Sequence, residues 1–491
     1  MRASFVAVAV VAGGFATMSA AEPPSEAEIA QACPETPFVQ PHKPRKLLVF
    51  TLTRGWRHAS IDTGARALRL LGEKTGAFTA TVTDDPAVFD RQRLRDFDAI
   101  VMLSTTGELF SPPESREARE TAGDDAGAAE LNRKQALIDF VLHGGGLVGI
   151  HAATDCFYGW PEYGRLIGGY FDGHPWHEQV GIRVEEPEHP LVRFLPPAGL
   201  TLVDEIYQFR EPYDRARLRV LLSLDPARTD MNKRGMKRRD GDYPVTWVRR
   251  FGRGRVFYCS LGHRDEVFAD PQVMRHYLAG IQYACGDLPA PDVPRLDERG
   301  GWRRLFDGKT LDGWQFKPGA WKVEDGAIAR AAGGSYIWTR EQFGDFELQL
   351  QFRLAPGTNS GVFFRTADLS DPVQTGIELQ ILDSAGKNEV GRHDCGAIYD
   401  CLAPRYNAVR PAGQWNHLRL VCRGAKIHAE LNGADIIDMD LDQWTEPHRN
   451  PDGSKNKFRT AYRDMPRRGY IGFQDHGKPV WYREIWIRPL D

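Results

Sequence analysis

The pattern of hydrophobic residues divides the chain into two parts. From residue 46 to 286, continuously apolar stretches alternate with stretches of helical spacing. The apolar stretches include KLLVFTL, DAIVMLST, LVGIHAAT and GRVFYCSLG; the helical ones include SIDTGARALRLLGEKTG, with Ser60 as the expected N-cap, and NRKQALIDFVLHGGG. Strands that are apolar on both faces and alternate with helices predict an α/β domain with a parallel sheet covered on both sides.

The second part begins after a polar, proline-rich segment, DLPAPDVPRLDERGG, which predicts a linker over residues 287–301. From residue 302 to 489, apolar and polar residues alternate in short segments such as FELQLQFRL, GIELQIL and HLRLVC. Asn432-Gly433 is a typical hairpin turn. Short alternating strands joined by such turns predict an all-β jelly-roll sandwich.

Composition and charge narrow the possible functions. The chain of 491 residues has 63 basic and 66 acidic side chains, and it lacks the basic runs with interleaved aromatic residues that nucleic-acid binding needs. Residues 1–21 combine Met1-Arg2, an apolar stretch and small residues, which predicts a signal peptide. The stretch is too short for a spanning helix, so we expect a periplasmic or secreted protein without membrane insertion. The oligomeric state stays open.

The cysteines do not form the dense pattern of a disulfide scaffold. There are seven of them, so at least one is free unless two chains pair. Cys395 and Cys401 are close enough in sequence to close a small loop, but buried thiols fit the sequence equally well.

Polar side chains follow the ends of the predicted parallel strands. His58 follows the first strand, His151 and Asp155 follow a later one, and His263 follows the last. Ligands bind at the carboxyl ends of strands in such sheets, so these residues are predicted to line a substrate-binding pocket. A metal site is a second possibility, and it would draw on a larger set that adds His174, His177, His189 and Glu205. A third is that several of these side chains only cap turns.

Several motifs in the first part resemble the ThuA-like (trehalose utilisation) family over residues 46–286: TRGWRHASI, GGGLVGIHAATD, GRLIGGYFDGHPW, HPLVRFLP, DEIYQF and PVTWVRRFGRGRVFYCSLGH. The resemblance implies a flavodoxin-like fold similar to that of class I glutamine amidotransferases. In the amidotransferases the turn holds a nucleophilic Cys, whereas here His151 stands in that place and Cys156 lies five residues later. Imidazole is a poor substitute for a thiolate, which argues against acyl-enzyme chemistry.

In the second part, strand alternation separates an apolar core face from a polar face. Glu378 and Gln380 alternate with apolar residues in GIELQIL, as do Gln474 and His476 in YIGFQDH. Arg365 lies on one side of the GVFFR strand, together with a phenylalanine. A solvated face usually carries Lys, Thr and Ser, so this set of side chains predicts a ligand surface.

The motifs FELQLQFRLAPGTNSGVFFR, GIELQILDS, GRHDCGAIYD, GQWNHLRLVCRG and GYIGFQDHG resemble the 3-keto-disaccharide hydrolase family over residues 302–489. The preceding WRRLFDGKTLDGWQF is similar to the usual opening of that family. The resemblance implies a concanavalin/laminin-G-like jelly roll, action on glycosides oxidised at carbon 3 of glucose, and dependence on a divalent metal ion of unknown identity.

A 3-keto sugar gives the polar residues possible roles. The ketone acidifies the hydrogen on carbon 2, so a base can start elimination of the glycosidic oxygen, and later addition of water gives net hydrolysis. Glu378 or His476 is the candidate base, and Arg365 or a metal ion the candidate stabiliser of the enolate. The strand-end and loop residues Asp383 and His393 are further catalytic candidates, and Gln380 and Gln474 are candidates for substrate binding.

The sequence therefore predicts an exported enzyme that cleaves 3-keto-glucosides or 3-keto-disaccharides and has a small carbohydrate as its ligand. One alternative is a carbohydrate-binding jelly roll that serves a catalytic ThuA-like domain. The other is a protein in which both domains bind sugar and neither is catalytic.

Overall fold

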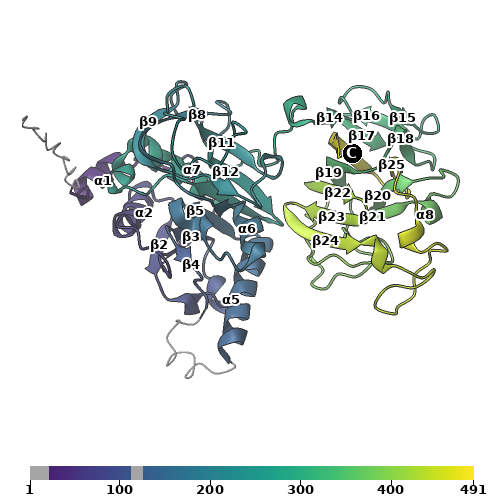
Figure 1. The fold of residues 1–491 in the computed structure, drawn as a ribbon, viewed down its shortest axis with the longest axis horizontal. Helices are drawn as coiled ribbons and strands as arrows, with labels where there is room; N and C mark the ends of the chain where they lie inside the picture. The colour runs from purple at the N-terminus through teal and green to yellow at the C-terminus, as the bar shows by residue number, and fades with distance from the viewer. Residues whose placement is uncertain (1–21, 112–124, 491) are drawn as a thin grey trace, which may run out of the picture.

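A computed structural model describes residues 22–111 and 125–490, so the predicted signal peptide lies outside the described residues. The chain forms a mixed α/β domain followed by an all-β sandwich, which confirms the predicted fold classes (Figure 1). Within the described residues, none of the helices has both the length and the hydrophobicity needed to cross a membrane.

A large mixed sheet organises the first domain. Its parallel part has the spatial order β2 (Thr79–Thr83), β1 (Lys46–Phe50), β3 (Ala99–Leu103), β5 (Gly146–Ile150) and β13 (Gly254–Cys259). Numbered by their sequence among themselves, these strands follow the 2-1-3-4-5 order of flavodoxin-like sheets. The continuous apolar runs form these strands because both faces of the sheet are covered.

Helices cover the two faces. Leu47 and Val49 of β1 pack in one core cluster with α1 (Glu26–Ala32), α2 (Ile61–Thr75) and α7 (Pro271–Ala284). Leu48 and Phe50 pack in another with α5 (Asp125–Leu142) and α6 (Pro161–Ile167). Short elements complete the domain: α3 (Arg91–Leu94), β4 (Thr106–Gly107), β6 (Asp155–Cys156), β7 (Tyr170–Phe171) and β10 (Phe209–Arg210).

Antiparallel strands extend the sheet beyond β13. They are β12 (Pro244–Phe251), β11 (Arg219–Leu224), β8 (Trp176–Val184) and β9 (Leu200–Ile206), in that spatial order. Asp204, near the end of β9, accepts hydrogen bonds from the backbone N–H groups of Gly262 (2.8 Å) and Arg264 (3.0 Å). The outermost strand therefore returns to the carboxyl end of β13.

Ser60 precedes α2, as predicted for an N-cap, but its side chain does not cap the helix. The hydroxyl donates instead to the carbonyl oxygen of Gly262, at 2.8 Å. The bond joins the loop after β1 to the loop after β13, so it holds together two segments that carry candidate site residues.

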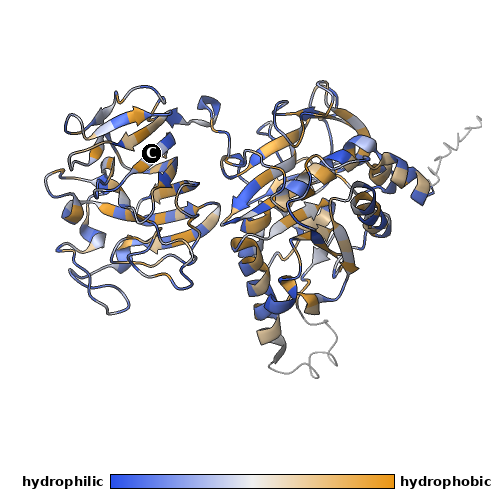
Figure 2. Ribbon diagram, turned by 180° about the vertical axis from the view of Figure 1, so that it is seen from behind, coloured by the Kyte–Doolittle hydropathy of each residue, from blue (hydrophilic) through white to orange (hydrophobic). Residues whose placement is uncertain are grey.

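Two antiparallel sheets form the second domain. The larger contains β16 (Trp321–Glu324), β17 (Ala327–Arg330), β26 (Val480–Pro489), β19 (Phe346–Leu354), β22 (Trp415–Arg423), β23 (Lys426–Leu431) and β24 (Ala434–Asp440), with β14 (Arg303–Arg304) beside β26. The smaller contains β15 (Trp314–Gln315), β18 (Ile337–Phe343), β25 (Gly469–Phe473), β20 (Asn359–Thr366) and β21 (Ile377–Leu382). The short helix α8 (Pro372–Thr375) connects β20 to β21 along the chain. Alternating apolar residues of both sheets form the core, and the hydropathy colouring of Figure 2 shows this alternation along the strands.

The predicted hairpin turn joins β23 to β24, and Asn432 (φ 50°) and Gly433 (φ 76°) both have the left-handed conformation that such a turn requires. The seven cysteines all lie within the described residues and are unpaired. Cys395 and Cys401 are buried thiols.

Charged groups and this hairpin turn hold the two domains together. Arg217 of the first domain contacts Glu430 of the second at 3.0 Å, and Arg165 contacts Asp435 at 2.8 Å. The carbonyl oxygen of Gly433 accepts a hydrogen bond from Arg249, at 2.6 Å. A Cβ atom at Gly433 would lie 2.2 Å from a backbone oxygen of the first domain, so only glycine permits this close approach.

The segment predicted as a linker is anchored to the first domain. Asp287 pairs with Arg45 at 2.6 Å, and Asp292 pairs with Arg250 at 2.5 Å. Since both carboxylates are buried, the segment keeps a fixed path between the domains.

Glu430 is buried at the domain interface, where its carboxylate pairs with Arg217 of the first domain and also accepts a hydrogen bond from Arg419 of its own domain at 2.6 Å. We expect Glu430→Gln to remove the buried negative charge that Arg217 and Arg419 share and to destabilise the protein on the order of 3 kcal/mol, although each arginine keeps a second carboxylate partner. Thermal unfolding should then begin several degrees lower. The control is Glu446→Gln, since the pair of Glu446 with Arg449 is exposed on both sides. Equal melting curves for the two variants would contradict the role given to Glu430.

Candidate functional site

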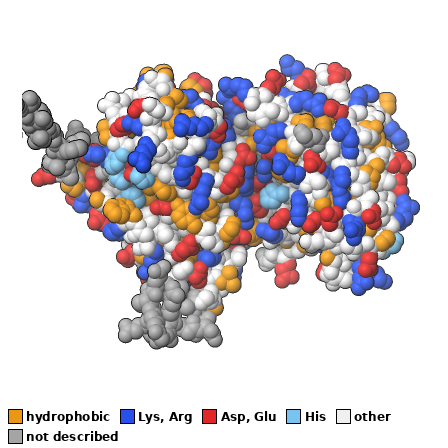
Figure 3. Space-filling model, in the orientation of Figure 1, with side chains coloured by type: hydrophobic (Ala, Val, Ile, Leu, Met, Phe, Trp, Pro, Cys, Tyr) orange, Lys and Arg blue, Asp and Glu red, His pale blue; other side chains and the backbone are white. Residues whose placement is uncertain are grey.

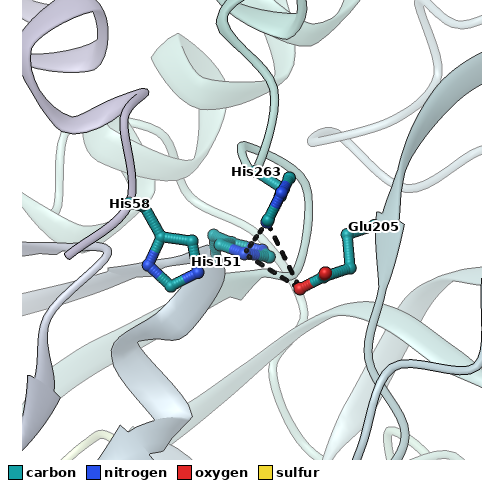
Figure 4. Close-up of side chains that lie close together, drawn as sticks. All are labelled: His58, His151, Glu205 and His263. Carbon is teal, nitrogen blue, oxygen red and sulfur yellow. Dashed lines mark hydrogen bonds and ion pairs between the residues drawn. The ribbon is translucent and has the colours of Figure 1, made fainter. Parts of the chain in front are cut away.

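The structure brings three histidines and a glutamate together at the carboxyl ends of the parallel strands (Figure 4). His58 lies in the loop after β1, His151 directly follows β5, and His263 follows β13. Glu205 comes from the end of β9, which returns to this edge of the sheet. The potential ligand atoms of the four side chains all lie within 4.8 Å of one another.

His151 has a left-handed backbone conformation with φ 49°, which is unusual for a residue with a side chain. Its carbonyl oxygen accepts a hydrogen bond from the Tyr258 hydroxyl at 2.7 Å, and its Nδ1 lies 2.8 Å from the carbonyl oxygen of Ser260. A carbonyl only accepts, so Nδ1 carries the proton and the lone pair of Nε2 points into the cluster. Burial lowers the pKa of His151 well below its usual value, so the ring is neutral.

His58 and Glu205 are also buried among polar groups. Burial, followed by the charge of His263, lowers the pKa of His58 to about 4, so this ring is neutral as well. Burial raises the pKa of Glu205, but the hydrogen bond and charge of His263, together with the charges of His174 and His177, outweigh burial, and the net effect is a lowered pKa. Glu205 is therefore an ionised carboxylate among imidazoles.

Two further histidines contact Oε2 of Glu205, the carboxylate oxygen that does not face His151 and His263. The Nδ1 atoms of His174 and His177 lie 3.2 and 3.8 Å from Oε2 of this carboxylate. Of the remaining candidates, Asp155 accepts a hydrogen bond from the Tyr158 hydroxyl at 2.5 Å and lies outside the group of four. His189 bonds to the carbonyl oxygen of Pro291 in the linker, at 2.8 Å.

In the second domain, a row of paired residues crosses the smaller sheet. Glu378 of β21 pairs with Phe363 of β20, Phe363 pairs with Gly472 of β25, and Gly472 pairs with Trp338 of β18. Paired residues of neighbouring strands point to the same side of a sheet, so Glu378 shares its face with two aromatic side chains. This is the polar face that strand alternation predicted.

The next row on the same face carries the two glutamines. Gln380 pairs with Gly361, and the backbone N–H of Gln474 donates to the carbonyl oxygen of Gly361 at 3.0 Å. The side-chain amide of Gln474 donates to the Tyr336 hydroxyl, also at 3.0 Å. The structure thus brings Glu378, Gln380 and Gln474 onto one surface.

Two glycines make room for the side chains of this surface. A Cβ atom at Gly361 would lie 2.3 Å from Oε1 of Glu378, and one at Gly472 would lie 2.2 Å from the Trp338 ring. The Phe363 ring contacts the Tyr336 and Trp338 rings at centroid distances of 5.6 and 5.8 Å. The result is an aromatic wall beside a carboxyl group that lies flat over the sheet.

Glu378 is 6% exposed, yet its carboxyl group has no hydrogen-bond or ion-pair partner among the described residues. Burial raises the pKa of Glu378 to about 7, while the charge of Lys457 acts in the opposite direction. The side-chain oxygens of Gln380 and Gln474 are also buried and have no partner in the described part of the chain. Unpaired buried polar atoms on one surface are typical of a ligand site.

Two residues from irregular segments, Tyr399 and Lys457, lie beside the Glu378 strand. The backbone N–H of Tyr399 donates to the carbonyl oxygen of Glu378 at 3.0 Å, and Nζ of Lys457 lies 4.1 Å from the centre of the Tyr399 ring. Tyr399 and Lys457 could not be predicted from the sequence, because both come from irregular segments without periodicity. Tyr336 and Trp338 were also not predicted, although their spacing of two in SYIWT was a usable signal.

The prediction that Arg365 belongs to this surface is wrong. A register shift interrupts β20 between Phe363 and Thr366, and Arg365 has φ 51°, so strand alternation fails at this position. The guanidinium instead donates to the carbonyl oxygen of Gly424 at 2.7 Å and to Asp345 at 2.8 Å. Arg365 joins turns of the sandwich and is unavailable to an enolate.

The other predicted catalytic residues lie in turns and loops. His476 follows the end of β25 at Phe473 and is exposed, because the strand stops before alternation reaches it. Asp383 accepts a hydrogen bond from the backbone N–H of Gly357 at 2.8 Å, which is the role of a turn cap. His393 is exposed; it bonds to Asp400 at 3.0 Å and contacts the Tyr399 ring at 4.9 Å between centroids.

The Glu378 surface does not fit a divalent metal ion. Within the described residues, the second domain has one group of three suitable ligand atoms, from His428, Glu430 and Asp435. That group lies at the domain interface, where arginines pair with both carboxylates. Glu378 has glutamines and aromatic rings around it rather than further charged ligands.

Comparisons with known proteins agree with the two-part architecture. Residues 46–284 match the family of trehalose utilisation, ThuA, and residues 301–488 match the 3-keto-alpha-glucoside-1,2-lyase-like domain. A 3-keto-disaccharide hydrolase from Bacteroides thetaiotaomicron is 27% identical over 230 residues, which cover 39% of this chain and 79% of the relative.

Two solved structures are similar to one domain each. A protein of Parabacteroides distasonis, provisionally named a glycosyl hydrolase, is 36% identical; the match covers 38% of this chain and 99% of that chain, with a TM-score of 0.37. A protein of Bacteroides uniformis, provisionally named ThuA-like, is 23% identical; the match covers 50% of this chain and 93% of that chain, with a TM-score of 0.38.

The fold and the family matches define a two-domain enzyme of the glycoside hydrolase type. More particularly, the chain is a fusion of a ThuA-family domain with a 3-keto-alpha-glucoside-1,2-lyase-like domain.

The unpaired state of Glu378 predicts a stability effect that needs no substrate. Because its pKa is raised from 4.5 to about 7, the stability of the native state falls as the pH rises through that interval and the unfolded chain ionises first. Glu378→Gln removes this loss, which amounts to at most about 3 kcal/mol. In thermal melts, the melting temperature of Glu378→Gln relative to that of the wild type should rise as the pH increases from 4.5 to 7. Glu446→Gln should show no such rise. A constant difference at all pH values would contradict the buried, unpaired carboxyl.

Proposed function

We propose that the second domain cleaves the glycosidic bond of glucosides that carry a ketone at carbon 3, by elimination followed by hydration, with Glu378 as the base. The observation that carries the proposal is a buried carboxyl group without a partner, on a face that also carries aromatic rings and unpaired amide oxygens. The family match of this domain, and a relative named 3-keto-disaccharide hydrolase, support the substrate class.

The elimination starts at carbon 2 of the sugar. Glu378 takes the proton on that carbon, and the electron pair of the C–H bond forms an enolate with the ketone at carbon 3. The enolate then re-forms the ketone as the C1–O bond breaks, which leaves a double bond between carbons 1 and 2. The released oxygen takes up a proton. Addition of water, with hydroxyl to carbon 1 and a proton to carbon 2, gives net hydrolysis.

The neighbouring side chains supply charge and orientation. A base with a pKa near 7 is well matched to proton abstraction at neutral pH, and burial gives Glu378 this property. The positive charge of Lys457 acts on Glu378 and lowers its pKa. Lys457 therefore takes the enolate-stabilising role that the sequence suggested for Arg365. The oxygens of Gln380 and Gln474 accept hydrogen bonds from sugar hydroxyls, and the rings of Tyr336 and Trp338, which pack on the buried Phe363, contact the sugar ring.

No step of this mechanism uses a metal ion, because the residues around Glu378 do not offer a ligand set. A small carbohydrate is the proposed ligand. A periplasmic or secreted location also remains a proposal, and N-terminal sequencing of the mature protein tests it.

A second candidate function is sugar binding without catalysis. The aromatic wall of Tyr336, Trp338 and Phe363 favours it, because sugar-binding surfaces use such rings. The two functions separate in the Glu378→Gln variant, which keeps nearly the same shape. Under the catalytic proposal this variant binds the 3-keto-glucoside but releases product at least about 10²-fold more slowly than the wild type. Under the binding function neither protein releases product.

Substitution at Glu378 and Gly361 tests the catalytic proposal. We expect Glu378→Gln to lower kcat/KM for a chromogenic 3-keto-glucoside by about 10²–10⁴-fold, the range for loss of a general base. Gly361→Ala should lower it by about 10²-fold, because the new methyl group displaces the carboxyl oxygen that lies 2.3 Å away.

Glu446→Gln is the matched control, since its carboxylate is exposed and pairs only with Arg449 in the described part of the chain. It should retain wild-type kcat/KM, and circular dichroism should show the wild-type fold for all three variants. Unchanged kcat/KM in Glu378→Gln would refute the assignment of the base.

A further inference from the structure

The cluster in the first domain has a geometry that its own hydrogen bonds do not explain. Nε2 of His151 lies 3.3 Å from Nδ1 of His263 and 3.7 Å from Oε1 of Glu205, and Nδ1 of His263 lies 3.3 Å from the same oxygen. Each residue uses the same atom in both of its contacts. Three donor atoms thus form a nearly equilateral triangle, whose sides are the dashed lines in Figure 4.

Two of these distances equal those between the ligands of a tetrahedral metal ion, and the third, 3.7 Å, is a few tenths of an ångström longer. Bonds of about 2.0–2.1 Å to nitrogen and oxygen, at tetrahedral angles, separate neighbouring donor atoms by about 3.3–3.4 Å. His58 borders the triangle, with its ring turned toward His151. Its ligand atom belongs to the group within 4.8 Å, and its Nδ1 is buried without a hydrogen-bond partner among the described residues.

The lone pairs of the cluster are free to bind a cation. The bond between His151 and the Ser260 carbonyl fixes the proton on Nδ1 and leaves Nε2 as a ligand atom, the arrangement that second-shell carbonyls give to metal-binding histidines. An anion is a poor fit, since the Glu205 carboxylate faces the same point.

An outer set of contacts holds the ligands in place. Oε2 of Glu205 contacts His174 at 3.2 Å, which leaves Oε1 directed at the triangle. Asp204 holds the loop that carries His263 through the N–H groups of Gly262 and Arg264. Such support of the ligands is what a bound metal requires, whereas surface histidines without a function rarely have it.

We propose that His151, His263 and Glu205, with His58 as the fourth donor, form a site for one divalent transition-metal ion of the zinc class in the first domain. Imidazole nitrogens with one carboxylate oxygen are suitable ligands for such an ion, and magnesium or calcium would call for more oxygen ligands. The inference does not depend on the function proposed for Glu378, which belongs to the other domain.

The site opens to solvent on one side. His174 and His177 are each about half exposed, and Figure 3 shows pale-blue histidine side chains gathered on the surface at the left of the first domain. A metal ion held by these four protein ligands can bind and polarise an oxygen atom of a small ligand if it takes that atom as a fifth ligand on the open side. The ThuA-family domain therefore holds a Lewis-acid centre of its own.

The test uses the full chain with zinc alone as the probe. The protein is freed of metal with a chelator, incubated with Zn²⁺, desalted and analysed by mass spectrometry of the elements. We expect one zinc per chain, and a loss of at least about tenfold in affinity for His263→Gln and Glu205→Gln. Replacement of zinc by Co²⁺ in the wild type should give the strong visible absorption of tetrahedral cobalt, a reading that needs no variant.

Control variants locate the ion. His143→Ala changes an exposed histidine of the same domain, and it should leave binding unchanged. Glu378→Gln should also bind zinc normally, so failure of the catalytic proposal and failure of the metal site are distinguishable. The absence of zinc from the wild type would overturn the proposal. Binding that survives in His263→Gln and Glu205→Gln but is lost in His428→Ala would also overturn it, because the ion would then lie at the domain interface.

Discussion

The unpaired carboxyl group of Glu378 is the constraint around which the smaller sheet of the second domain is organised. A buried carboxyl that no partner neutralises is kept only if the surrounding fold compensates for its cost. Here glycine stands at Gly361, the one residue type that leaves room for the carboxyl over the sheet, and aromatic rings form the adjacent wall. The same burial that makes this arrangement costly raises the pKa of Glu378 to about 7, so the cost and the proposed reactivity have one physical origin.

Three buried glutamates in this chain show how the surroundings decide what a carboxyl group can do. Glu430 lies among arginines and becomes part of the joint between the domains. Glu205 lies among histidines whose ring nitrogens contact its oxygens, which is the arrangement that the proposed metal site requires. Glu378 has neither kind of partner. The same side chain thus joins the two domains at Glu430, and we propose that it binds a metal ion at Glu205 and abstracts a proton at Glu378.

Much of the fold could be predicted, because it follows from local periodicity. Apolar runs gave the parallel strands, and the rule that ligands meet at strand ends placed His58, His151 and His263 at one edge. The sequence could not single out Glu205 as a member of this cluster, since its position depends on the return of β9 to the end of β13. No local pattern encodes that path.

Alternation placed Glu378, Gln380 and Gln474 on one face, and it failed where a strand was irregular. The bulge in β20 redirects Arg365, and the end of β25 leaves His476 in a loop. Lys457 and Tyr399 reach the surface from segments without regular structure, so only the folded chain brings them to Glu378.

The central claim is that Glu378 removes the proton from carbon 2 of a 3-keto sugar. The most direct measurement is the exchange of that proton for deuterium, followed by proton NMR with the full chain and 3-keto-glucose in heavy water. This sugar offers the acidic hydrogen but no aglycone to expel. The account predicts that the wild type catalyses exchange at carbon 2 and that Glu378→Gln does not. Hydrolysis of a 3-keto-glucoside by the wild type without any exchange at carbon 2 would contradict it.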